Sequence, residues 1–161
     1  MRIDYREIIS SDKSFFNEML YEAIFVEKGK PKLPRLIIKD PSIAKYTQGF
    51  GTLDLDIGIV ALYENKPIGV IWGRAFSIDN KGYGFIHEDI PEIRMAIQSE
   101  FRNKGIGTEL LCRIEVAYRK LGVTALSLSV DKKNPAKRLY QRNGYLNYSE
   151  KDGAITMKKN I

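Results

Sequence analysis

Residues 102–107 read Arg-Asn-Lys-Gly-Ile-Gly and join an apolar run, Ile93–Ile97, to an amphipathic segment, Thr108–Leu121. This order predicts a strand, a glycine-containing loop and a helix. The first turn of a helix leaves backbone N–H groups unpaired and carries partial positive charge, and glycine lets a ligand approach bare backbone. The segment therefore predicts a phosphate-binding loop, although a glycine turn that only connects two elements would show the same hexad.

Two other kinds of phosphate-binding loop are excluded by the glycine spacing. A P-loop requires G-x-x-x-x-G-K-[ST], and a dinucleotide-binding fingerprint requires G-x-G-x-x-G. Neither pattern occurs in the chain. If the hexad binds an anion, it is a site of a different type, and the flanking sequence must indicate which ligand it binds.

A second motif follows the hexad in the chain. Leu126–Val130 is a strand-like run, and residues 134–145 read Asn-Pro-Ala-Lys-Arg-Leu-Tyr-Gln-Arg-Asn-Gly-Tyr. In order and spacing, the two motifs resemble the acyl-CoA loop and the following strand and helix of the GNAT superfamily of N-acetyltransferases. The chain departs from the usual pattern at Ser99, where many members have Pro, and at Asn103, where Gly is common, but neither change removes a backbone donor.

The resemblance implies a mixed α/β fold of GNAT type. Its central sheet is mostly antiparallel, with six or seven strands, splayed parallel strands four and five, and about four helices. Hydrophobic periodicity, caps and turn residues place the elements. We expect helices from Ser11-Asp12 to about Val26, from Pro41 to near Gly49, over Thr108–Leu121, and from Asn134 to Gly144; hairpins at Ile57–Tyr63 with Pro67–Phe76 and at Tyr145–Glu150 with Ala154–Lys159; and parallel strands at Glu92–Ile97 and Leu126–Val130.

Composition favours one soluble domain over residues 1–161. The chain is 43% hydrophobic, has one cysteine and one histidine, and carries a formal charge of +6. No cysteine and histidine cluster is present, so we expect no metal site. The apolar runs are too short to cross a bilayer and the first residues lack the apolar core of a signal peptide, which predicts a cytoplasmic protein. The basic residues are scattered among acidic ones, so neither nucleic acid nor membrane is an expected partner.

The resemblance implies acetyl-CoA as cosubstrate and assigns residues to it. Its pantetheine arm would lie along the strand at Met95, Ala96 and Ile97, bonded to main chain. Its pyrophosphate would meet the N–H groups of the loop, and Asn134 would touch the coenzyme while also serving as a plain helix cap. The loop residues are Arg102, Asn103, Lys104, Gly105, Ile106, Gly107 and Thr108.

Two residues are candidates for proton transfer. Tyr140 matches the general acid of the superfamily, and an ordinary phenol is protonated at neutral pH; a half-buried packing residue is the alternative. Glu92 is the candidate base, acting directly or through water, and a solvent-facing strand start is its alternative. His87 in a polar loop is expected to be solvated, and Cys112 to be structural or incidental. Trp72 and Arg74 are expected to serve core packing and surface charge, and an aromatic wall and an anion partner for the acceptor are their alternative roles.

The sequence thus predicts an acetyl-CoA-dependent N-acetyltransferase that acts on a primary amine by direct attack in a ternary complex. The acceptor is a small molecule or a peptide. Acidic residues would attract a cationic acceptor if they converged, namely Glu18, Glu22, Glu27, Glu88, Asp89 and Glu92. A non-catalytic acyl-CoA-binding sensor on the same fold is the alternative, and a homodimer is expected only from the resemblance.

Overall fold

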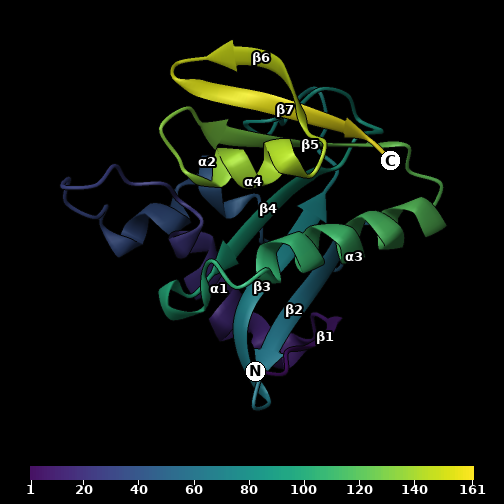
Figure 1. Cartoon of the computed structure of the whole chain (residues 1–161). Helices are drawn as coiled ribbons and strands as arrows, with labels where there is room; N and C mark the ends of the chain where they lie inside the picture. The colour runs from purple at the N-terminus through teal and green to yellow at the C-terminus, as the bar shows by residue number, and fades with distance from the viewer.

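The computed structural model describes all residues from Met1 to Ile161 and contains a seven-stranded sheet in the order β1-β2-β3-β4-β5-β7-β6. Neighbouring strands are antiparallel except β4 and β5, which are parallel, so the predicted GNAT-type sheet is confirmed. Figure 1 shows this arrangement. The strands are β1 (Asp4–Glu7), β2 (Ile57–Tyr63), β3 (Lys66–Arg74), β4 (Glu92–Ile97), β5 (Ala125–Asp131), β6 (Leu146–Lys151) and β7 (Ala154–Asn160).

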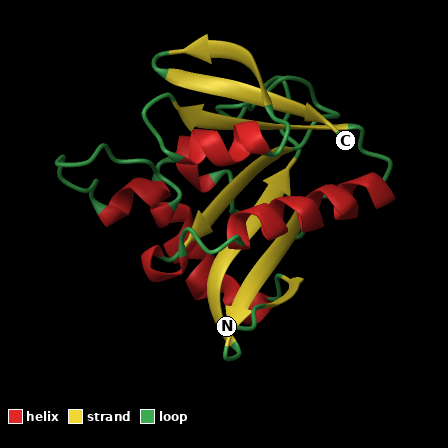
Figure 2. Cartoon of the chain, viewed as in Figure 1, coloured by secondary structure: helices red, strands yellow, loops and turns green.

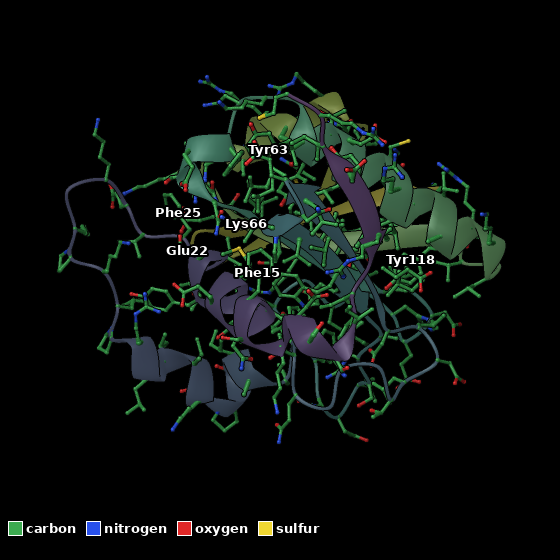
Figure 3. The ribbon with its side chains drawn as sticks, turned by 90° about the horizontal axis from the view of Figure 1, so that it is seen from below. Phe15, Glu22, Phe25, Tyr63, Lys66 and Tyr118 are labelled. Atoms are coloured by element: carbon green, nitrogen blue, oxygen red, sulfur yellow. The ribbon has the colours of Figure 1, made fainter.

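Helices cover both faces of the sheet (Figure 2). One face packs against α3 (Ile106–Lys120) and α4 (Ala136–Arg142), whose apolar stripes include Leu110 and Ile114. The other face packs against α1 (Lys13–Glu22) and α2 (Pro41–Ala44) in a second cluster around Trp72. Figure 3 shows Phe15 on α1 and Tyr118 on α3, on opposite sides of the strands. No helix is long and apolar enough to span a membrane.

The parallel pair β4 and β5 is joined at one register position, where Glu92 lies opposite Ser127. The N–H of Ser127 donates to the carbonyl of Pro91 at 3.0 Å. Beyond this point β4 runs away from β5, and α4 lies in front of the gap (Figure 1). The predicted splay of the two strands is therefore present, and it opens toward the end of β4 that leads into residues 102–107.

Several boundaries differ from those predicted. α1 ends at Glu22 rather than near Val26, because the N–H of Ile24 bonds the carbonyl of Tyr21 three residues back and Gly29, Pro31 and Pro34 follow soon after. α3 begins at Ile106 rather than Thr108, because Gly105 with φ of 80° already caps it. β1 and the 3-10 turns at Ser10–Asp12, Arg35–Lys39 and Ser99–Phe101 were not predicted, since elements this short carry little periodic signal.

The second predicted helix begins at Pro41, as expected, behind Asp40, whose carboxylate accepts the N–H of Ser42 at 2.9 Å. Regular helix ends at Ala44, and turns carry the chain on to Gly49, which has φ of 62°. This compact turn region places Tyr46 beneath the sheet, where it is 1% exposed. The position of Tyr46 is important for the site described below.

Candidate active site

The loop after β4 presents a continuous set of free hydrogen-bond donors. No backbone N–H from Asn103 to Thr108 donates to a protein acceptor, whereas the N–H of Glu109 bonds the carbonyl of Gly105 at 3.2 Å. Asn103 and Gly105 have positive φ, 59° and 80°, which turns successive N–H groups to one side of the loop. Unpaired donors at a helix start form an anion site.

One predicted member of this set contributes differently. The N–H of Arg102 already bonds the carbonyl of Ser99 at 3.3 Å, so Arg102 offers its side chain rather than its backbone. Its Nε donates to the carbonyl of Ile97 at 2.9 Å, and its guanidinium lies 3.8 Å from the carboxylate of Glu22 on α1. Glu22 is the last residue of α1 and is labelled in Figure 3. At this position the structure therefore offers the charged side chain of Arg102, held by Ile97 and Glu22, and not a free backbone N–H.

The backbone of β4 also has free polar groups along the gap. The N–H of Gln98 bonds Ile68 on the β3 side at 2.9 Å, and backbone groups alternate sides along a strand. Met95 and Ile97 therefore direct their N–H and C=O groups toward β5, which has diverged. Ala96 bonds β3 instead, so of the three predicted residues it can supply contact surface but not main-chain hydrogen bonds.

Gly107 holds the loop, β4 and α4 together. A Cβ added there would lie 2.8 Å from Leu139 on α4 and 3.4 Å from Met95 on β4. Only glycine allows these elements to approach so closely without rearrangement. Asn134 lies two residues before the first residue of α4, and its side-chain oxygen accepts the N–H of Ala136 at 2.9 Å. The capping role predicted for Asn134 is thereby confirmed, and its amide nitrogen stays available to a ligand.

Glu92 is buried rather than solvent-facing, with 2% of the residue exposed. One carboxylate oxygen accepts the hydroxyl of Tyr46 at 2.7 Å, and the other accepts the backbone N–H of Gly84. Burial raises the pKa of Glu92, while the nearby charge of Arg94 opposes the rise. Each oxygen retains a second lone pair. Glu92 is thus a carboxylate of increased basicity at the point where β4 and β5 separate.

Tyr140 is buried on α4 with 8% exposed, and its hydroxyl makes no hydrogen bond within the protein. Its ring packs edge-on against Tyr145 at 6.0 Å. Burial raises the pKa of Tyr140 to about 12, and the charge of Arg94 acts in the opposite direction. The phenol is therefore protonated at neutral pH. The charge of Arg94 thus lowers the pKa of both proton-transfer candidates, Tyr140 and Glu92, against the effect of burial.

The other residues considered in the sequence analysis either lie on the surface or have structural roles. His87 and Cys112 are exposed, as expected. Trp72 is 1% exposed and donates its indole N–H to the carbonyl of Tyr46 at 3.0 Å. The assignment of Arg74 as surface charge is wrong, because Arg74 is 5% exposed and binds Asp56 with two 2.8 Å hydrogen bonds. No cluster of three or more possible metal ligands is found.

The six acidic residues do not converge on a binding surface. Glu92 is committed within the protein, and Glu88 accepts the backbone N–H of Ile78 at 3.1 Å. Asp89 is exposed beside His87. The remaining three face cations: Glu18 lies 2.5 Å from Arg35, Glu22 lies 3.8 Å from Arg102 and Glu27 lies 3.1 Å from Lys133. The six residues therefore do not form the shared acidic surface that was expected to attract a cationic acceptor, and Glu92 is the one buried carboxylate among them.

Sequence reasoning missed four residues around Glu92. Tyr46 comes from the turn after α2, Arg94 is on β4, and Gly82 and Gly84 lie in the loop before β4. A Cβ on Gly84 would lie 2.6 Å from the Glu92 carboxylate and 2.7 Å from the backbone of Leu128, so the loop requires glycine there. The paired glycines were the one local signal. Tyr46 gave none, because its partner is 46 positions away.

Comparisons with known proteins agree with this geometry. The model of the Acetyltransferase (GNAT) family matches residues 20–145, and no curated protein matches the chain. PaiA N-acetyltransferase from Thermoplasma acidophilum, solved with coenzyme A, is 20% identical with a TM-score of 0.74, and the match covers 100% of both chains.

Two further solved structures are similar over almost the whole chain. A putative acetyltransferase from Salmonella typhimurium, solved with acetyl-CoA, is 17% identical, covering 99% of this chain and 94% of that one, with a TM-score of 0.69. Ribosomal-protein-alanine N-acetyltransferase from Brucella melitensis is 17% identical, covering 98% and 99%, with a TM-score of 0.66. At these identities the similarity concerns the fold.

Proposed function

The chain belongs to the GNAT family of acetyltransferases, and on this premise we propose that it transfers an acetyl group from acetyl-CoA to a primary amine. The observation that carries the proposal is the run of free N–H groups from Asn103 to Thr108 at the open end of the gap between β4 and β5. A pyrophosphate requires several donors and positive potential, and this loop supplies both. Two of the structural neighbours were solved with coenzyme A or acetyl-CoA.

Backbone groups, together with the side chains of Arg102 and Asn134, would hold the coenzyme. The loop N–H groups and the side chain of Arg102 would bind its phosphates. The free backbone groups of Met95 and the free N–H of Ile97, whose carbonyl already accepts the Nε of Arg102, would bind the pantetheine amides. Asn134 would add its amide. Gly107 lets α3 pack closely against Leu139 and Met95, since a Cβ there would meet both side chains. When bound, acetyl-CoA supplies the acetyl group as a thioester.

Glu92 and Tyr140 would move the two protons of the reaction. An acceptor amine must lose a proton before or during attack, and a buried carboxylate with a raised pKa is suited to accept it, directly or through a water. The hydroxyl of Tyr140, with a pKa of about 12 and no internal acceptor, holds a proton that it can give to the leaving sulfur. Direct attack requires both substrates to be bound together, so orientation supplies much of the acceleration.

Calorimetry tests the coenzyme assignment. The protein is titrated with acetyl-CoA, coenzyme A and ATP, and we expect both coenzyme forms to bind while ATP does not. A folded protein that binds neither coenzyme form would overturn the proposed function. Thiol release is then followed with a panel of primary amines.

Tyr140→Phe tests the acid at the level of kinetics. We expect kcat to fall by about 10²-fold or more, since positioned acids contribute that much, with unchanged affinity for acetyl-CoA. Tyr148→Phe, on an exposed side chain of β6, is the matched control and should behave as the parent protein. Unchanged kcat in Tyr140→Phe would remove Tyr140 from this role.

A further inference from the structure

Arg94 is a partly buried arginine that the chain leaves without a partner. Its Nε is fully buried and makes no hydrogen bond, and no carboxylate lies within ion-pair distance of its guanidinium. Arg74 on the neighbouring strand provides the comparison. There the guanidinium binds Asp56 with two hydrogen bonds and donates to the carbonyls of Lys45 and Gln48. The same fold satisfies one arginine completely and leaves the other open.

Aromatic rings position the Arg94 guanidinium without using its hydrogen-bond donors. Its central carbon lies 3.8 Å from the ring centre of Tyr46 and 5.9 Å from that of Tyr83. Cation–π stacking occupies the face of the guanidinium plane, whereas the N–H groups point outward in that plane. A stacked guanidinium is therefore held against the ring, and the N–H groups at its rim remain able to donate hydrogen bonds. A planar oxyanion that accepts two parallel N–H groups is the best complement to this edge.

The surroundings connect this cation to the proposed reaction. Glu92, Arg94 and Ser127 lie on the same face of the sheet, opposite to the face of the Ile93 and Leu128 side chains. The Oγ of Ser127 is a second buried polar atom without a partner. Tyr83 is 56% exposed, so the side of Arg94 that faces Tyr83 adjoins solvent. The guanidinium of Arg94, the hydroxyl of Ser127 and the buried carboxylate of Glu92 thus lie near the closed end of the gap, where β4 and β5 meet.

We propose that Arg94 binds a carboxylate carried by the acceptor, so that the acceptor is a free amino acid or a closely related amino carboxylate. This inference rests on the proposed acetyltransferase function and names its substrate class. Residues two apart on a strand are separated by roughly 6–7 Å at Cα. Glu92 and Arg94 lie two positions apart on β4 with their side chains on the same face, so they present one negative and one positive group on the same side of the strand.

This arrangement distinguishes among the acceptor classes. The N-terminus of a peptide has an amide in place of the neighbouring carboxylate, so it leaves Arg94 unpaired. A polyamine brings further positive charge toward an unpaired guanidinium, which is unfavourable in a partly buried site. A free amino acid satisfies Arg94 and can donate from its ammonium group to Glu92 before deprotonation. Arg94 would then set specificity, while Glu92 and Tyr140 would carry out the proton transfers.

The test compares each standard amino acid with its own amide. Both are titrated by calorimetry into protein saturated with coenzyme A, which requires no turnover, and kcat/KM with acetyl-CoA is then measured for the same pairs. We expect the preferred amino acid to bind at least tenfold more tightly than its amide. Because the amine of an amide is less basic and more often neutral, amine reactivity cannot account for a preference for the acid.

Three variants assign the preference to Arg94. Arg94→Gln should lower affinity for the amino acid at least tenfold and change that for the amide less than twofold, while acetyl-CoA affinity stays constant. Arg94→Lys should keep part of the preference, since it retains charge but not the planar fork. Arg142→Gln removes an exposed arginine at the end of α4 and should change nothing. A melting curve establishes that each variant is folded.

The possible outcomes separate the two proposals. Wild-type protein that binds acetyl-CoA but shows no preference for any acid over its amide overturns the role of Arg94 and leaves the acetyltransferase function intact. A preference that survives in folded Arg94→Gln also overturns it. If Arg94→Gln does not fold, the wild-type comparison and Arg94→Lys decide. Protein that binds no coenzyme overturns the proposed function, and the acceptor assignment with it.

Discussion

Tyr46→Phe removes one oxygen from the centre of the buried network and should destabilise the protein by about 2–4 kcal/mol. The Tyr46 hydroxyl donates to the Glu92 carboxylate at 2.7 Å and accepts the N–H of Tyr83 at 2.7 Å. A hydrogen bond to a charged group contributes about 1.5–3 kcal/mol, and leaving a partly buried N–H unpaired costs up to about 1 kcal/mol more. The ring itself is retained, so the stacking with Arg94 and the packing with Phe76 are kept.

The destabilisation should depend on pH. Burial already raises the pKa of Glu92, which means that the folded protein binds this proton more tightly than the unfolded chain. Ionisation of Glu92 therefore lowers stability as pH rises from the unfolded pKa through the folded one, and the Tyr46 bond offsets part of that loss. Without the hydroxyl the pKa of Glu92 rises further. The stability difference between parent and Tyr46→Phe should thus be smaller in acid than at pH 8.

Urea unfolding followed by circular dichroism measures this effect at several pH values. Tyr83→Phe is the matched control, because the Tyr83 hydroxyl bonds only the exposed hydroxyl of Ser42 at 3.1 Å and should contribute less than about 0.5 kcal/mol. Equal stability of the two variants, or a loss that does not depend on pH, would refute the reasoning. Such a result would mean that the Glu92 carboxylate does not rely on Tyr46.

Further predictions concern the second buried ion pair and the loop. Asp56→Ala leaves Arg74 buried without its carboxylate and should cost about 3–5 kcal/mol in urea unfolding, whereas Asp54→Ala, on an exposed neighbour, should cost less than about 0.5 kcal/mol. Thr108→Glu adds an acid to the first turn of α3, so thermal unfolding should be unchanged or slightly higher while calorimetry shows acetyl-CoA binding at least tenfold weaker. Stronger coenzyme binding in Thr108→Glu would contradict the anion site. Glu92→Gln should lower kcat/KM about 10²-fold and remove the acidic limb of its pH profile, and a retained limb would assign that limb to another group.

Local patterns predicted the positions of most elements because helices and hairpins depend on neighbouring residues. Asp40 caps α2 through a hydrogen bond to a residue two positions away, and Gly105 caps α3 through its own positive φ. Predictions that required distant partners were less successful. Arg74 was assigned to the surface because nothing near it in sequence indicates Asp56, which lies on the other side of the β2–β3 hairpin.

The candidate site shows the same division between local and distant information. The glycines of residues 102–107 and their place before a helix predict this loop from local sequence alone. The burial of Glu92 was not, since its donors Tyr46 and Gly84 come from two other segments that meet only in the folded sheet. Arg94 gave no sequence signal, because an arginine in a strand is usually a solvated side chain. Its importance depends on the absence of a partner, which only the three-dimensional arrangement reveals.

The single register position between β4 and β5 has a mechanical consequence. Every other pair of neighbouring strands shares several register positions, so β1–β4 and β5–β7 form two parts of the sheet that are paired with each other only at Glu92 and Ser127. We expect small rotations of one part relative to the other to occur about this contact and to change the width of the gap at the far end of β4. The loop at residues 103–108 lies at that end, where the lever arm is longest. We therefore expect a ligand that fills the gap to restrict the angle between the two parts of the sheet.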